Sequence, residues 1–163
     1  MAYVWDATSG QLLHRLAGHS NWVVDVGINP DNRTGFTLSR DRTIIIWDLR
    51  IGQEIRRFGA GLILGPEMLS AVYSPDGRYI LSNNGGLPIR NPGEEANLIL
   101  WNAVTGEPVR TFHGHSGGVG GLAISPDGRK ALSGAFIGEM ILCDIETGAI
   151  IERFSENSPD WRE

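Results

Sequence analysis

The chain has 163 residues, of which 41% are hydrophobic and 20% are charged, and its formal net charge is −5 at pH 7. This composition is typical of a folded globular protein. The acidic balance and the lack of a basic run disfavour nucleic acid and anionic membranes as partners. One cysteine excludes an internal disulfide framework, and no apolar stretch reaches the roughly 20 residues of a transmembrane helix. With no signal-peptide pattern at the start, the sequence predicts a cytoplasmic protein that binds neither nucleic acid nor membrane.

One unit recurs along the chain, and its landmarks keep a common register. Four landmark positions are spaced 42, 54 and 42 residues apart: Trp5, Trp47, Trp101 and Cys143. An acid or amide directly follows each landmark, and a glycine stands five residues after each landmark. Pro-Asp turns recur between the landmarks, at Pro30-Asp31, Pro75-Asp76 and Pro126-Asp127. A period of this length indicates a repeat architecture.

In chain order, residues 2–16 are predicted to form two strands, the last two of a unit. Three complete units follow, near residues 17–58, 59–112 and 113–154, and a polar tail covers residues 155–163. Each complete unit is predicted to hold four short strands, rich in Val, Ile and aromatic residues and bounded by turn formers. In the first complete unit these strands are Trp22–Gly27, Gly35–Ser39, Thr43–Trp47 and Glu54–Phe58. No window shows a helical period, so the predicted fold class is all-β.

The Gly-His, Pro-Asp and Trp-Asp landmarks at this spacing resemble the WD-repeat β-propeller family, over about residues 2 to 154. The resemblance implies blades of four antiparallel strands, packed face to face around a channel. It also implies a hydrogen-bonded set of His, Ser or Thr, acid and Trp that locks each blade. In the first complete blade these residues are His19, Thr37, Asp41 and Trp47.

The second complete blade departs from this pattern and is longer. It has Gly61 where the histidine is expected, keeps Ser82 and Trp101, and offers Glu95 as the best remaining acid. Most of its extra length lies in residues 83–96, whose Asn, Gly and Pro content predicts a surface loop. That loop is either a neutral insertion or a binding loop on a rigid scaffold.

The third complete blade keeps His115 and Ser133, while Ile137 and Cys143 stand where the acid and the indole are expected. We therefore expect a complete network in the first complete blade alone. The other two blades are expected to rely more on apolar packing. Cys143 is interpreted as a buried and inert thiol.

About three and a half blades form an open arc, because closed propellers typically have 4–8 blades. The end blades of such an arc need neighbours or caps to bury their faces. The chain is therefore interpreted either as a fragment with missing blades in a longer chain or as a unit that self-associates.

Signals for chemistry are weak. Residues 114–118 match the G-x-S-x-G pattern of a nucleophile elbow, but no helix is predicted after them. The glycines at 59–65 lack the helix that a phosphate loop needs. His113 and His115 have no cysteine nearby for a metal site, and Glu94-Glu95 is interpreted as a pair of solvated loop charges. We expect no enzyme activity, no cofactor and no bound metal.

A protein-binding surface is the better functional hypothesis. In WD-repeat proteins the recognised face carries residues shortly after each Gly-His and just before the turn acid. Gly118 and Gly120 hold such positions in the third blade and offer little side-chain contact. The candidates for partner binding are Trp22, Val24, Arg40, Glu67, Asn84, Arg90 and Glu94.

The primary prediction is a non-catalytic scaffold that presents this face to a protein partner. The first alternative is a sensory or regulatory propeller segment of a larger signalling protein, with a kinase or ATPase domain elsewhere. The remote alternative is a propeller that binds a small molecule or hydrolyses a substrate.

Overall fold

The computed structural model describes residues 1–60, 70–83 and 96–155. Within these ranges the ordered elements are β-strands, and they form one two-stranded and three four-stranded antiparallel sheets. The all-β prediction is therefore confirmed, and the sheets match propeller blades in an arc that is not closed. In the part of the chain that the structure describes, no helix is long and apolar enough to cross a membrane.

The first sheet is a hairpin of β1 (Ala2–Trp5) and β2 (Leu12–Leu16). The turn between them is held by the Asp6 carboxylate, which accepts hydrogen bonds from the backbone of Thr8 at 3.0 Å and of Ser9 at 2.7 Å. Gly10 closes the turn with φ of 69°, a conformation that glycine adopts without a steric penalty. The hairpin thus corresponds to the predicted last two strands of a unit.

Each four-stranded sheet is built from consecutive strands, so each strand pairs with its chain neighbour. The first comprises β3 (Val23–Ile28), β4 (Thr34–Ser39), β5 (Ile44–Asp48) and β6 (Gln53–Phe58). The second comprises β7 (Ala71–Tyr73), β8 (Tyr79–Asn83), β9 (Ala96–Asn102) and β10 (Pro108–His115). The third comprises β11 (Val119–Ile124), β12 (Lys130–Ala135), β13 (Met140–Asp144) and β14 (Ile150–Phe154). Strand β10 passes the expected unit boundary at residue 112 and pairs His115 with Ala96.

The Pro-Asp turns owe their shape to one carboxylate each. Asp76 accepts a hydrogen bond from the Ser74 hydroxyl at 2.6 Å and one from the Arg78 backbone at 3.1 Å. Asp127 repeats this arrangement in the next sheet, with the Ser125 hydroxyl at 2.6 Å. The Ser74 hydrogen bond is the main cause that lowers the pKa of Asp76 to about 2. The turns are therefore fixed by ionised side chains, as their composition predicts.

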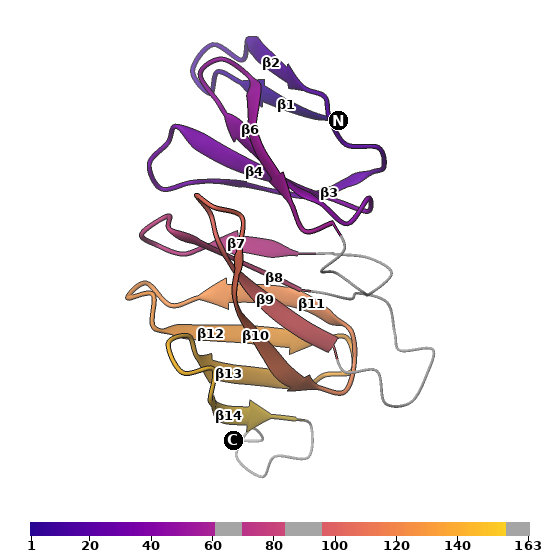
Figure 1. Ribbon diagram of the computed structural model, residues 1–163, viewed down its shortest axis with the longest axis vertical. Coiled ribbons are helices and arrows are strands. Elements are labelled where there is room, and N and C mark those ends of the chain that lie inside the picture. The colour runs from indigo at the N-terminus through magenta and orange to yellow at the C-terminus, as the bar shows by residue number, and fades with distance from the viewer. Residues whose placement is uncertain (61–69, 84–95, 156–163) are drawn as a thin grey trace.

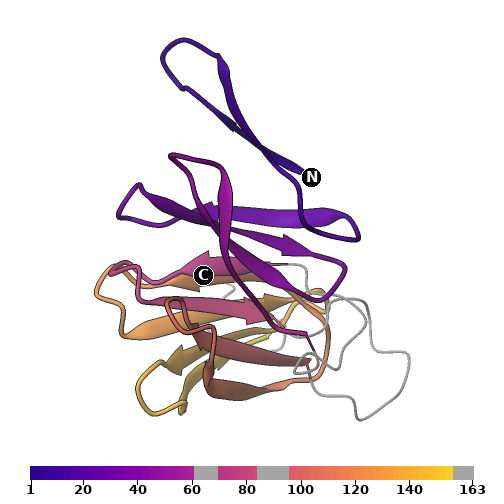
Figure 2. The ribbon, with the colours of Figure 1, turned by 45° about the horizontal axis from the view of Figure 1, so that its top comes forward.

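The sheets stack face to face along the chain, with β1–β2 at one end and β11–β14 at the other (Figure 1). Turning the molecule keeps the indigo β1–β2 hairpin at one end, beyond β3–β6 (Figure 2). Three apolar cores lie between successive sheets, and they include Trp47, Trp101 and Ile141 respectively. The cores fix the sheets relative to one another, so the loops at the strand ends are presented on a rigid frame.

Candidate functional site

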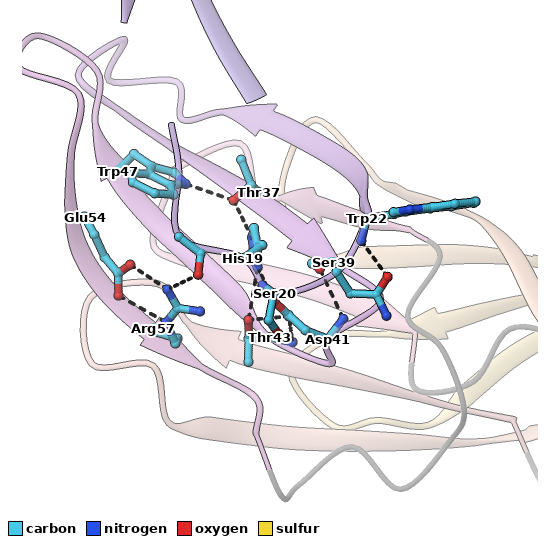
Figure 3. A network of polar contacts seen from close by, with 12 residues as sticks. His19, Ser20, Trp22, Thr37, Ser39, Asp41, Thr43, Trp47, Glu54 and Arg57 are labelled. Carbon is cyan, nitrogen blue, oxygen red and sulfur yellow. Dashed lines mark hydrogen bonds and ion pairs between the residues drawn. The ribbon is translucent and has the colours of Figure 1, made fainter. Parts of the chain in front are cut away.

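A chain of hydrogen bonds runs through the first complete blade (Figure 3). The Trp47 indole N–H donates to Thr37 Oγ1 at 2.9 Å, and Thr37 Oγ1 lies 2.7 Å from His19 Nε2. On the other side of the ring, His19 Nδ1 lies 2.9 Å from Asp41 Oδ2. A carboxylate oxygen accepts, so Nδ1 carries the proton and Nε2 accepts from the Thr37 hydroxyl. The structure thus joins all four residues of the expected set in one directed chain.

Asp41 is the most heavily bonded member of this network. Its carboxylate also accepts the Ser20 backbone N–H at 2.9 Å and the Thr43 hydroxyl at 2.6 Å. Burial raises the pKa of Asp41, but the hydrogen bonds from Thr43, Ser20 and His19 outweigh it and lower that pKa from 3.8 to about 2. Asp41 therefore stays ionised and ties the Gly-His loop to the β4–β5 hairpin.

The third complete blade contains an acid in its network, which corrects the expectation that Ile137 leaves it without one. His115 Nε2 lies 2.6 Å from Ser133 Oγ, and its Nδ1 lies 3.1 Å from Glu139 Oε2. Glu139 also accepts from Arg153 at 2.9 Å, and Arg153 donates to the Gly114 carbonyl. Glu139 lies two residues nearer to strand β13 than the expected position at Ile137. Its longer side chain reaches the His115 ring as Asp41 reaches the His19 ring in the first blade.

Burial is the main influence on the titratable groups of this third network. It lowers the pKa of His115 below its usual 6.5, while Glu139 opposes the change and Arg153 adds to it. Burial likewise raises the pKa of the Cys143 thiol, so the thiol stays protonated at neutral pH. Cys143 is buried, in the position of the missing indole.

In the second complete blade, two members of the expected network lie within the described residues, Ser82 and Trp101, and they are hydrogen-bonded to each other. The Trp101 indole N–H donates to Ser82 Oγ at 2.9 Å, and both side chains are buried. Gly61 and Glu95, the positions expected for the histidine and the acid, lie outside the described residues.

Trp22 stands at the strand ends on the side of these networks, with its indole turned away from His19 (Figure 3). Its side chain is 70% exposed, and the Arg40 guanidinium lies 5.0 Å from the ring centroid. The backbone N–H of Arg40 donates to the Trp22 carbonyl at 2.9 Å, which joins the two loops. The stacked guanidinium and this hydrogen bond hold the indole in the solvent.

Val24, another expected contact residue, is half-buried and packs against the core between the first two complete blades. Its side chain is therefore placed for packing more than for contact with a partner. Four further candidates, Glu67, Asn84, Arg90 and Glu94, lie outside the described residues.

Two apolar side chains of the third blade belong to the same face, and the sequence reasoning missed them. Phe136 and Ile137 form the β12–β13 tip and are 59% and 58% exposed. Phe136 lies over Gly120 and Ile137 over Gly117, because a Cβ added to either glycine would meet their side chains at 2.6 Å and 3.0 Å. Gly117 and Gly120 thus leave the space in which the side chains of Ile137 and Phe136 lie. The signal was available in the sequence, as two large apolar residues at a hairpin tip.

The geometry gives little support for catalysis. Both ring nitrogens of His115 are engaged with Ser133 and Glu139, so neither is free to activate Ser116. The described chain continues from Gly114 through a short loop into strand β11, where a nucleophile elbow requires a helix. Across residues 1–60, 70–83 and 96–155 no group of three His, Cys, Asp or Glu side chains could hold a metal ion.

The fold and the networks together define a class: β-propeller blades locked by His–hydroxyl–acid hydrogen bonds. The family model described as WD domain, G-beta repeat matches residues 10–48 and 106–136. The chain belongs to the WD40-repeat β-propeller family, as the sequence resemblance predicts. Proteins of this family are usually non-catalytic.

The relatives are longer than this chain. It is 30% identical over 150 residues to a guanine nucleotide-binding protein subunit beta of Oryza sativa subsp. japonica, covering 89% of this chain and 37% of that protein. It is 25% identical to the U3 snoRNP-associated protein-like EMB2271 of Arabidopsis thaliana, covering 91% of this chain and 33% of that protein. The crystal structure of the RRP9 WD40 repeats superposes with a TM-score of 0.74 at 21% identity, covering 86% of this chain and 40% of that one. The chain thus spans well under half the length of these proteins.

Proposed function

We propose that this chain is a non-catalytic scaffold that binds a protein partner through the strand ends carrying Trp22 and the Phe136–Ile137 tip. The observation that carries the proposal is the 70% exposure of Trp22 over the Arg40 guanidinium. Tryptophan and arginine are enriched at interface hot spots, where a rigid aromatic side chain fills a pocket on the partner. The Phe136–Ile137 tip adds apolar contact area on the same side of the stack.

The networks beneath this face give it rigidity. Asp41 and Glu139 tie the Gly-His loops to the neighbouring hairpins through Ser20 and Ser116, with N···O distances of 2.9 Å and 3.4 Å. A preorganised surface loses less conformational entropy on binding than a mobile one does. This is the mechanism by which a propeller without catalytic groups can act as a selective binder.

The comparison with the guanine nucleotide-binding protein subunit beta also supports a second candidate, a regulatory propeller segment of a larger signalling protein. The scaffold proposal is the simpler one, since it needs nothing outside the described residues. The exclusion of nucleic acid stays a prediction, because one relative carries a U3 snoRNP name. The cytoplasmic location also stays a prediction.

The test is quantitative affinity capture from lysate with three immobilised proteins: the wild-type chain, Trp22→Ala and Val104→Ala. Val104 is a matched control, because it is 74% exposed in the β9–β10 turn and lies outside the proposed face. We expect a set of proteins that wild type and Val104→Ala retain and that Trp22→Ala loses. Equal capture by all three proteins would refute this contact face, provided that circular dichroism shows each to be folded.

A further inference from the structure

A pocket of about 360 Å³ lies between the second and third complete blades, at their Pro-Asp turns. The β7–β8 and β11–β12 turns that border it lie side by side in both ribbon views (Figure 1 and Figure 2). Its lining residues all belong to the described part of the chain. Trp22 precedes strand β3 whereas Pro30 follows it, so the Pro-Asp turns lie at the strand ends opposite to the proposed partner face. The pocket is therefore a separate feature of the molecule.

The corresponding gap between the first and second complete blades is occupied by two side chains. Asn29 stands directly before the proline of its turn, and its Nδ2 donates across the gap to the Gly77 carbonyl at 3.2 Å. The fit is close, because a Cβ added to Gly77 would collide with the Asn29 amide. Tyr73, two residues before the proline of the next turn, packs on Phe36 with ring centroids 5.2 Å apart. Asn29 and Tyr73 are 9% and 8% exposed, so together they close this first interface.

A shorter side chain stands at the first of these positions in the second interface. Ser74 takes the place of Asn29. Its hydroxyl bonds within its own turn, where it donates to Asp76 Oδ1 at 2.6 Å and accepts the Tyr79 backbone N–H at 3.0 Å. Gly128 is the counterpart of the glycine that Asn29 contacts, and a Cβ added to it would meet nothing beyond its chain neighbours closer than 4.0 Å. The space that the amide fills in the first interface is therefore open in the second.

The second position and the surface around it are apolar. Ile124 stands where Tyr73 stands, and it lacks the aromatic ring. Leu100 and Ile145 line the pocket with it, as does the side chain of Tyr79. Ile124, Ile145 and Tyr79 are partly buried against the core between the two sheets. Surface of this kind accepts the hydrocarbon part of a ligand.

Two carboxylates and one guanidinium also line the pocket. Asp76 Oδ2 accepts the Arg78 Nε–H at 2.7 Å, so these two charges are paired. Asp127 Oδ1 accepts the Ser125 hydroxyl at 2.6 Å and the Arg129 backbone N–H at 3.0 Å, while its Oδ2 accepts no hydrogen bond from the described residues. The Ser125 hydroxyl is the main cause that lowers the pKa of Asp127, which is therefore ionised at neutral pH. One carboxylate oxygen of the pocket thus stays available to a cation.

We propose that this pocket binds a small organic cation, an ammonium group on a short hydrocarbon chain. Asp127 holds the ammonium, and Leu100 and Ile124 contact the hydrocarbon. A free alkylamine and the lysine side chain of a partner share this chemistry. The volume of about 360 Å³ lies within the range of small-molecule sites.

The charges favour this ligand over the alternatives. An anion would face two carboxylates and a guanidinium that is already paired, which disfavours its binding. Besides the Ser125 hydroxyl, the charges of Arg129 and Lys130 help to lower the pKa of Asp127, but neither residue lines the pocket. A bare metal ion needs more ligands, and no group of three His, Cys, Asp or Glu side chains among the described residues could hold one. A neutral hydrocarbon would gain nothing from the Asp127 carboxylate.

The test is NMR spectroscopy of the purified chain during titration with n-butylammonium chloride, which copies a lysine side chain. Signals of the Leu100, Ile124 and Ile145 methyl groups and of the Gly128 amide should shift to saturation. Neutral n-butanol and anionic n-butyrate have chains of the same length, and both should bind more weakly, n-butyrate most of all. N-acetyl-lysine N-methylamide separates the two sources. Binding as tight as that of n-butylammonium assigns the pocket to a lysine side chain, and binding of n-butylammonium alone assigns it to a free amine.

Variants copy the closed interface into the open one. Ser74→Asn and Ile124→Tyr introduce the two side chains that close the first interface, and each should abolish the saturable shifts. The matched control Ile28→Tyr makes the same exchange at the equivalent position of the first complete blade, where Ile28 is 66% exposed, and should bind as wild type does. Asp127→Asn should raise the dissociation constant of n-butylammonium roughly threefold and leave that of n-butanol unchanged. Its counterpart in the first turn, Asp31→Asn, should change neither.

Three results would overturn the proposal: wild type without saturable shifts at these methyl groups, n-butanol or n-butyrate that binds as tightly as n-butylammonium, or undiminished binding in folded Ser74→Asn and Ile124→Tyr. Circular dichroism shows whether each variant is folded, and if one is not, the other still closes the pocket. Trp22 lies outside the pocket, so the failure of this proposal and that of the partner face are distinguishable.

Discussion

The first and third complete blades build the same lock from different residues. In the first, Asp41 at the hairpin tip reaches His19, and Trp47 closes the chain through Thr37. In the third, Glu139 reaches His115 from a position that corresponds to Thr43, and Cys143 replaces the indole. The difference shows that the network requires a carboxylate within hydrogen-bonding distance of the histidine ring. A glutamate meets this requirement from a position two residues further along the hairpin than an aspartate does.

The different position of the acid in the two blades changes which side chains are exposed at the hairpin tips. With Asp41 turned inward, the first blade leaves Arg40 and Trp22 to make the exposed contacts. With the acid moved to Glu139, the third blade can place Phe136 and Ile137 at its tip, both exposed. One blade thus presents a cation with an indole, and the other presents an apolar pair.

The largest expected effect concerns the position that holds Trp47 in the first complete blade and Cys143 in the third. Trp47→Ala should lower the free energy of unfolding by roughly 3–5 kcal/mol, because it empties a buried volume and leaves Thr37 without its donor. Cys143→Ala removes one sulfur atom and should cost about 1 kcal/mol. Urea unfolding followed by circular dichroism measures both. Equal losses would contradict the account of the first blade as the more dependent on its network.

A pair of glycines gives the next largest contrast. A Cβ on Gly27 would clash with the ring of Phe36, which is only 2% exposed and lies in the core between two sheets. Gly27→Ala should therefore cost roughly 2–3 kcal/mol by overpacking. A Cβ on Gly120 would lie 2.6 Å from the Phe136 ring, which is exposed and can swing away. Gly120→Ala should thus cost less than about 1 kcal/mol, as thermal unfolding of both variants would show; a greater loss at Gly120 would refute a solvent-facing Phe136.

Replacing the acid of the first blade should cost about 2 kcal/mol at pH 7, because Asp41→Asn removes the charge that His19 and Thr43 stabilise. The folded pKa of Asp41 is depressed to about 2 from 3.8, so its contribution is complete above pH 4 and is lost as the pH falls through 2. The stability gap between wild type and Asp41→Asn should narrow over this window in acid titrations of the unfolding free energy. A gap that stays constant from pH 4 to 2 would show that the ionised carboxylate is not its source.

The smallest expected effect tests the equivalence of the two arrangements. Glu139→Thr should cost roughly 1–2 kcal/mol, because His115 and Arg153 lose their acceptor. Adding Ile137→Asp rebuilds the order of the first blade, with the acid at the tip and threonine beside the strand. The double variant should recover at least half of the loss in unfolding free energy. No recovery would mean that the third blade cannot use the tip position.

Much of the fold is readable from the sequence, because turn residues and β-branched runs at a fixed period determine the strands locally. The network around His19 is readable for the same reason, since its members recur at fixed offsets. Glu139 was missed because an offset from Ser133 points to Ile137, while side-chain reach is a property of the folded hairpin. A second repeat would have helped: Arg57 and Arg153 each bond the carbonyl of a Gly-His glycine, Gly18 and Gly114, 39 residues earlier.

The expected contact surface is less readable. Exposure depends on neighbouring sheets, so Val24 and Trp22, two residues apart in one segment, differ in what they touch. Phe136 and Ile137 were passed over because the glycines opposite them suggest an empty surface, whereas the folded hairpin lays both side chains across those glycines.

The central claim, that Glu139 holds the place of Asp41 in the third blade, is tested most directly at the ring of His115. Nitrogen-15 NMR of the imidazole distinguishes the two tautomers, and a carboxylate acceptor requires the proton on Nδ1. We predict that His115 is neutral with its proton on Nδ1 at pH 7, and that Glu139→Gln changes the Nδ1 signal of His115 while the signal of His19 stays as it is. A proton on Nε2 of His115, or a signal indifferent to Glu139→Gln, would contradict the claim.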